Sequence, residues 1–111
     1  MALSDEQRDL VRSALAKDRL RTLLGVVHRV AALQLDEDYN DTRLWKMAVS
    51  NRSERLRLIQ GGMRASKLMR KIGDAIYSKE ISDVDLLVMI DELVLLDHLD
   101  GSAIVEQCRN I

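Results

Sequence analysis

The segment DVDLLVMIDELVLLDHL, residues 83–99, constrains the fold more than any other part of the chain. On a helix that turns by about 100° per residue, its apolar side chains fall on two faces. A helix that is apolar on two faces has to be covered on both of them. The chain therefore either surrounds this helix with its own helices or covers one face with another subunit. The first face holds Leu86, Leu87, Ile90, Leu93 and Val94, and the second holds Val88, Met89, Leu95, Leu96 and Leu99.

The rest of the chain also favours helices. It has no proline, which would end a helix by steric clash, and it has no strand-length run of β-branched residues. Its 111 residues fit one domain with one core, and 47% hydrophobic with 32% charged residues is typical of globular proteins. We predict a single all-α domain over residues 1–111, a compact bundle of five or six helices. A long central basic helix and the acidic, highly apolar helix of residues 83–99 are its two expected features.

Capping signals place the first helix. Ser4 followed by Gln7 is a capping box, which predicts a helix near 5–17. The next apolar stripe points almost opposite to the stripe of that helix. The chain therefore either turns near Lys17 and Asp18, or continues as one long helix that is contacted on both sides. The residues of this next stripe are Leu20, Leu23, Leu24, Val27, Val30 and Ala31.

Two further helix boundaries follow from the C-terminal sequence. Ser82 with Asp85 is a variant of the capping box and opens the acidic helix. Gly101 is expected to close that helix near Leu99, because glycine is the preferred residue just after a helix end. A short terminal helix is predicted over residues 102–109.

The acidic segment 36–41 is turn-prone and precedes a predicted helix over residues 44–48. It begins like a calcium-binding loop, but Asp41 replaces the turn glycine and Met47 replaces the bidentate glutamate. The chain also lacks a glycine-rich phosphate loop, a nucleophile elbow and a Cys–His pair at a suggestive spacing. We therefore expect no metal site, no cofactor and no catalysis.

The net charge of −1 conceals a basic centre and an acidic end. Residues 43–79 hold ten basic and two acidic side chains, a net +8, and residues 80–111 hold one basic and eight acidic side chains, a net −7. The basic segment could bind nucleic-acid phosphates or an acidic partner, or it could be a solvated face balanced by the acidic helix. The candidate contact residues are Arg52, Arg55, Arg57, Arg64, Lys67, Arg70 and Lys71.

Gly61 and Gly62 stand inside this basic segment, where two glycines cost a helix about 2 kcal/mol relative to alanines. The apolar stripe changes phase across the pair, which indicates either a bent or broken helix or a continuous helix packed on both sides. With Ala65, the glycines make a small-xxx-small spacing at which another helix could approach closely. We prefer close helix packing at Gly61, Gly62 and Ala65, which would make Gly62→Leu costlier than Gly62→Ala.

These features together favour a small non-catalytic regulatory protein that binds another protein as an inhibitor, antiactivator, adaptor or assembly subunit. We expect a homodimer whose interface includes the second face of the acidic helix. The alternative is a nucleic-acid-associated regulator or assembly subunit that binds phosphates through residues 52–71. A cytoplasmic location is expected, because no segment resembles a membrane span or a signal peptide and Cys108, the one cysteine, has no partner for a disulfide.

Overall fold

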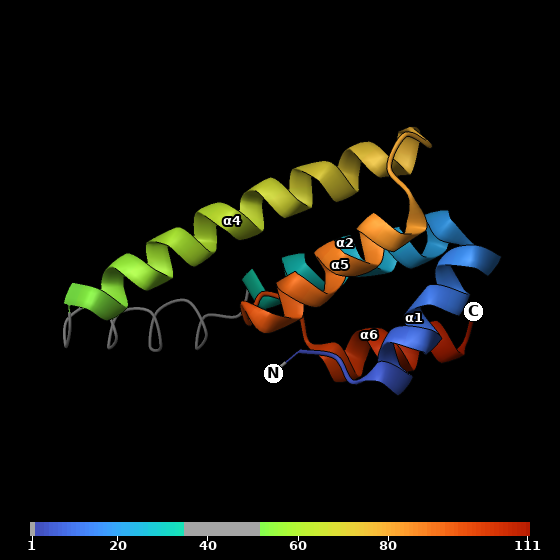
Figure 1. Cartoon of the computed structure of the whole chain (residues 1–111), viewed down its shortest axis with the longest axis horizontal. Coiled ribbons are helices and arrows are strands. Elements are labelled where there is room, and N and C mark those ends of the chain that lie inside the picture. The colour runs from blue at the N-terminus through green and yellow to red at the C-terminus, as the bar shows by residue number, and fades with distance from the viewer. Residues whose placement is uncertain (1, 35–51) are drawn as a thin grey trace.

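The computed structural model describes residues 2–34 and 52–111, and for residues 34 and 52–60 it describes the backbone alone. The described residues form five helices and no strand, which confirms the all-α class. The predicted segments 36–41 and 44–48 lie outside the described residues. In chain order the helices are α1 (Asp5–Lys17), α2 (Arg19–Gln34), α4 (Arg52–Tyr77), α5 (Asp83–Leu95) and α6 (Gly101–Arg109) (Figure 1).

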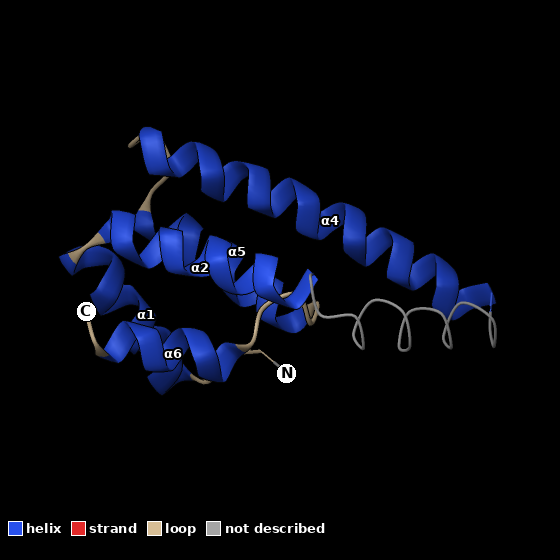
Figure 2. Cartoon of the chain, turned by 180° about the vertical axis from the view of Figure 1, so that it is seen from behind, coloured by secondary structure: helices blue, strands red, loops and turns tan. Residues whose placement is uncertain are grey.

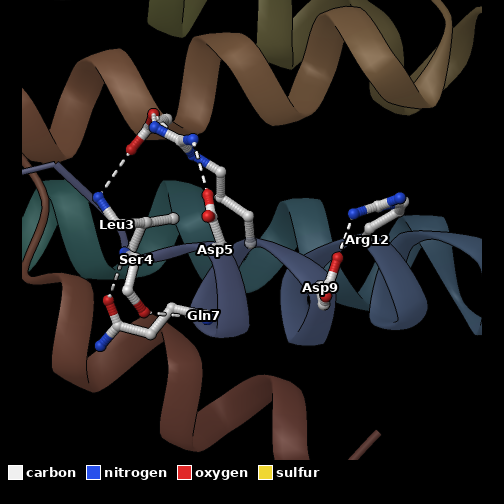
Figure 3. A network of polar contacts seen from close by, with 8 residues as sticks. Leu3, Ser4, Asp5, Gln7, Asp9 and Arg12 are labelled. Atoms are coloured by element: carbon white, nitrogen blue, oxygen red, sulfur yellow. Dashed lines mark hydrogen bonds and ion pairs between the residues drawn. The ribbon is translucent and has the colours of Figure 1, made fainter.

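The capping box that opens α1 is present. The Gln7 N–H donates to Ser4 Oγ at 3.2 Å, and the Ser4 N–H donates to Gln7 Oε1 at 2.9 Å (Figure 3). The helix ends where the chain turns at Asp18, whose N–H still donates to the Ala14 carbonyl at 2.8 Å. The chain therefore makes two helices here, and the alternative of one long helix is wrong.

The helices form one globule, but α4 is not central. It packs against α2 and α5 along one side, whereas α1 packs against α2, α5 and α6. Both views show the N-terminal half of α4 extending beyond the other described helices (Figure 2). The prediction of a central basic helix is not confirmed, because among the described side chains of α4, residues 61–77, the buried ones follow a single stripe. That stripe consists of Ala65, Leu68, Ile72 and Ala75.

The helix α4 runs through Gly61 and Gly62 without a break. A Cβ atom on Gly62 would have no described atom within 4 Å, and one on Gly61 would meet only Leu96 Cδ2, at 3.9 Å. The predicted close packing is therefore not found at Gly62 among the described residues, although Ala65 is buried. The described residues therefore offer no neighbour that Gly62→Leu would overpack, and they give no support to the larger cost expected for that substitution.

The side chain of Gln107 closely approaches Gly25 of α2, a glycine for which no prediction was made from the sequence. A Cβ atom on Gly25 would overlap Gln107 Nε2 of α6, so the missing side chain leaves room for this amide. The available signal was a lone glycine inside the apolar part of a helix, which indicates a packing role. The neighbour that uses the space comes from 82 positions further along the chain, and only the tertiary structure shows it.

The predicted start of α5 is confirmed and its predicted end is wrong. Ser82 Oγ accepts from the Asp85 N–H at 3.2 Å, as the capping pattern requires. The helix ends at Leu95, because Asp97 takes the left-handed conformation (φ 62°) that usually falls to glycine. The His98 N–H then donates to the Leu93 carbonyl at 3.0 Å, the long bond of a Schellman motif. Gly101 instead begins α6, the predicted terminal helix.

Candidate functional site

Three apolar side chains of α5 remain exposed on one face and define the α5 ridge. They are Val84, Val88 and Leu95, with exposed fractions of 67%, 61% and 59%. Intervals of four and seven residues place them on the same side of the helix. On the opposite side Ile90 and Leu93 are fully buried. Of the two apolar faces expected from the sequence, the protein's own helices therefore cover one.

The predicted interface residues divide between this ridge and the core. Val88 and Leu95 belong to the ridge, and Met89 and Leu96 are half-buried beside it. Leu99 is buried in the core, so its prediction as an interface residue is wrong. The reason is the turn at residue 97, which takes Leu99 off the helix and points it inward.

Val84 was missed as a ridge residue. It lies four residues before Val88, so the helical spacing carried the signal.

Two ion pairs border the α5 ridge. Arg8 of α1 donates to Asp91 Oδ2 from Nη2 at 2.7 Å and from Nε at 3.1 Å. Arg64 of α4 donates to both oxygens of Glu92, at 2.6 and 2.9 Å. At about 100° per residue, Asp91 and Glu92 lie on opposite sides of the ridge. Each carboxylate next to the middle of the ridge is therefore neutralised by an arginine of the same chain.

The Arg64–Glu92 pair affects the pKa of both groups. The hydrogen bonds from Arg64 lower the pKa of the Glu92 carboxyl, and the positive charge of Lys71 acts in the same direction. Because a lowered carboxyl pKa favours the folded state above the unfolded pKa, this contribution is lost as the pH falls through the folded pKa. The Arg64 side chain is 47% exposed and the Glu92 side chain 29% exposed, so solvent screens the pair, which adds little to stability and chiefly sets the charge beside the ridge.

The basic candidates are only partly brought together. Arg64 is held by Glu92, while Lys67, Arg70 and Lys71 are exposed on the outer face of α4. Asp74 is exposed on the same face and reduces its positive charge. The side chains of the other three candidates, Arg52, Arg55 and Arg57, lie outside the described residues.

The described residues contain no group of three or more His, Cys, Asp or Glu side chains placed to hold a metal ion. Burial lowers the pKa of His98, and the charge of Asp97 opposes that effect. Burial raises the pKa of the Cys108 thiol to about 11, so the thiol is protonated at neutral pH.

The buried Cys108 gives a direct test of the packing of α6. We expect the folded protein to react with iodoacetamide at pH 7.5 at least about 100-fold more slowly than the protein unfolded in guanidinium, because the thiolate is the reactive form. A raised pKa stabilises the folded state in full below pH about 9, and this contribution is lost as the pH rises through about 11. Equal labelling rates in the two states would show that the thiol is accessible.

No protein-family model, curated protein or solved structure matches the chain. Of the helices that the structure describes, none has a stretch long and apolar enough to cross a membrane.

Proposed function

We propose that this protein is a small non-catalytic regulatory or assembly protein that acts by binding other protein chains, and that it forms a homodimer through the α5 ridge. The observation that carries the proposal is the ridge itself, three branched apolar side chains that are each more than half exposed. Exposed apolar patches of this kind mark protein interfaces. The paired arginines beside the ridge favour a second copy, because the approach of two α5 helices brings together neutralised carboxylates.

An antiparallel arrangement of two α5 helices fits the spacing of the ridge. A two-fold axis that crosses the helix between Met89 and Ile90 relates residue 84 of one chain to residue 95 of the other. Val84 would then pack against Leu95 in both halves of the interface, as a symmetric dimer requires. Antiparallel helices also align their macrodipoles favourably.

The expected dimer is weak. Stable interfaces bury about 800 Å² on each partner, and three partly exposed side chains with their half-buried neighbours supply less apolar surface than that. We therefore expect a dissociation constant on the order of micromolar.

Sedimentation velocity from micromolar to submillimolar concentration tests the dimer. We expect Leu95→Glu to weaken self-association at least about tenfold, because it places an unpaired charge in the interface. Leu24→Glu is the matched control, since Leu24 is exposed to a similar extent but lies on α2. A chain that is monomeric throughout this range, or a dimer unaffected by Leu95→Glu, would rule out the α5 interface.

Binding to nucleic acid is the second proposal. It is supported by the exposed Lys67, Arg70 and Lys71 on one face of α4, which could contact successive phosphates. Against it, Arg64 is already paired and Asp74 lies among these cations. Binding of a 20-base oligonucleotide that weakens steeply with salt, and that is lost on charge reversal at Lys67 and Arg70, would support this alternative.

A further inference from the structure

A second apolar surface lies on α2. The sequence placed Leu20, Leu23 and Leu24 on one stripe, but the structure buries only Leu23 of these three. Leu20 and Leu24 are 52% and 50% exposed, one helical turn apart on the same face. Val27, one turn further on, is half-buried beside them. Leu20 and Leu24 are thus exposed, although Leu23, next to Leu24 in the same helix, is fully buried in the core.

The C-terminal half of α4 continues this surface. Arg19 Nη2 donates to the carbonyls of Ser78 at 3.4 Å and Ile81 at 2.6 Å, which places the start of α2 beside the end of α4. The two helices pack together and run in opposite directions (Figure 1). Leu20 and Leu24, near the start of α2, therefore lie close to the last turns of α4.

Gly73 and Tyr77 lie on one flank of α4. Arg64 and Lys71, on the other flank, act on Glu92 of α5, so the flank with Gly73 and Tyr77 points away from α5. A Cβ atom on Gly73 would have no described atom within 4 Å, and Tyr77 is 93% exposed. We call the surface formed by Leu20, Leu24, Gly73 and Tyr77 the α2–α4 face.

The charges around the α2–α4 face are mainly positive. Residues 19–34 contain no Asp or Glu, and residues 61–77 contain one, Asp74. At the Leu20 end of the face Asp18 is exposed, and Asp83 pairs with Arg19 at 3.5 Å. Arg21 and Arg70, beside the exposed leucines and Gly73 respectively, are themselves exposed. The face therefore combines exposed leucines with nearby cations, whereas the α5 ridge is bordered by neutralised ion pairs.

We infer that the α2–α4 face binds an acidic amphipathic helix of another protein. Leucines one turn apart and the open side of Gly73 suit the apolar stripe of a helix, and the cations on both sides suit its carboxylates. Nucleic acid fits less well, because the Leu20 and Leu24 side chains have no hydrogen-bond donor or positive charge for a phosphate. Their apolar surface would also not be matched by the polar backbone of a nucleic acid. The inference rests on the proposed protein-binding function, and it assigns the partner to a different surface from the α5 ridge.

A labelled peptide tests this inference on the full chain. The probe is a 20-residue helical peptide with leucines at helical spacing and glutamates elsewhere, and its matched control carries lysines in place of the glutamates. Fluorescence anisotropy should show binding of the glutamate peptide that weakens with salt, and at least tenfold weaker binding of the lysine peptide. Leu24→Glu should weaken binding of the glutamate peptide at least tenfold, and Arg21→Glu should weaken it and reduce its salt dependence.

The control variant is Leu95→Glu, which should bind the glutamate peptide as the unchanged protein does even where it is monomeric. Loss of self-association with retained peptide binding would separate the two surfaces, so failure of one proposal leaves the other standing. Circular dichroism checks folding, and Leu24→Ala replaces Leu24→Glu if the charged variant unfolds. Equal binding of both peptides, no effect of either Leu24 variant, or displacement of the peptide by an oligonucleotide would overturn the inference.

Discussion

Leu93→Ala is expected to lower the free energy of unfolding by about 3–4 kcal/mol. Leu93 is fully buried in the core on the inner face of α5. Its truncation removes buried apolar surface and leaves a cavity that the surrounding helices fill only in part. Urea unfolding followed by circular dichroism, at a concentration where the chain is monomeric, measures the change.

Leu95→Ala is the matched control for Leu93→Ala. It removes the same atoms from the same helix two residues away, but Leu95 is more than half exposed. We expect it to cost less than about 1 kcal/mol in the monomer. Similar losses from the two variants would show that the ridge is covered within a single chain, which would also remove the basis for the proposed dimer.

Asp91→Ala is expected to cost about 2 kcal/mol and to loosen the N-terminal segment. The Asp91 side chain is only 18% exposed. It accepts hydrogen bonds from the Leu3 N–H, at 2.8 Å, and from Nε and Nη2 of Arg8. Its removal leaves the Leu3 N–H and the Arg8 guanidinium without these partners, and the buried Leu3 side chain loses its anchor. Stability is again measured by urea unfolding.

A double-mutant cycle separates the two roles of Asp91. Arg8→Ala removes the ion pair but keeps the bond to Leu3, so we expect it to cost less than Asp91→Ala. Asp91→Asn keeps an acceptor for Leu3 and should fall between the two. Hydrogen exchange should show faster exchange of the Leu3 amide in Asp91→Ala than in Arg8→Ala. Additive effects of the two alanine changes would contradict the coupling of Arg8 and Asp91. Unchanged exchange at Leu3 in Asp91→Ala would contradict the proposed anchoring.

The local features of the fold were predictable from the sequence. The caps at Ser4 and Ser82 depend on residues three positions apart, so a short stretch of chain contains the whole interaction. The change in direction of the apolar stripe left two alternatives, a turn near Asp18 or one long helix contacted on both sides, and the structure has the turn. The two apolar faces of α5 followed from helical spacing, which sets side-chain direction directly.

One helix end and the features that depend on distant residues were not predictable. The end of α5 was misplaced because aspartate at residue 97 takes a conformation that glycine prefers, while Gly101 is used at the start of α6. Arg19 was not singled out, although it holds the carbonyls of Ser78 and Ile81. The role of Gly25 depends on Gln107 of another helix.

For the candidate site, the sequence showed that α5 has two apolar faces and that the charges are divided between the centre and the end of the chain. It could not show which face the chain covers, since that depends on how the other described helices pack with α5. Nor could it show that Asp91 and Glu92 are neutralised by Arg8 and Arg64, which lie 83 and 28 positions away in the chain. Helical periodicity and capping act over a few residues, and they therefore indicated by themselves which side chains share a helix face and where the helices after Ser4 and Ser82 begin. Exposure and ion pairing depend on which distant side chains become neighbours, so only the tertiary structure decided that the α5 ridge and the α2–α4 face are exposed.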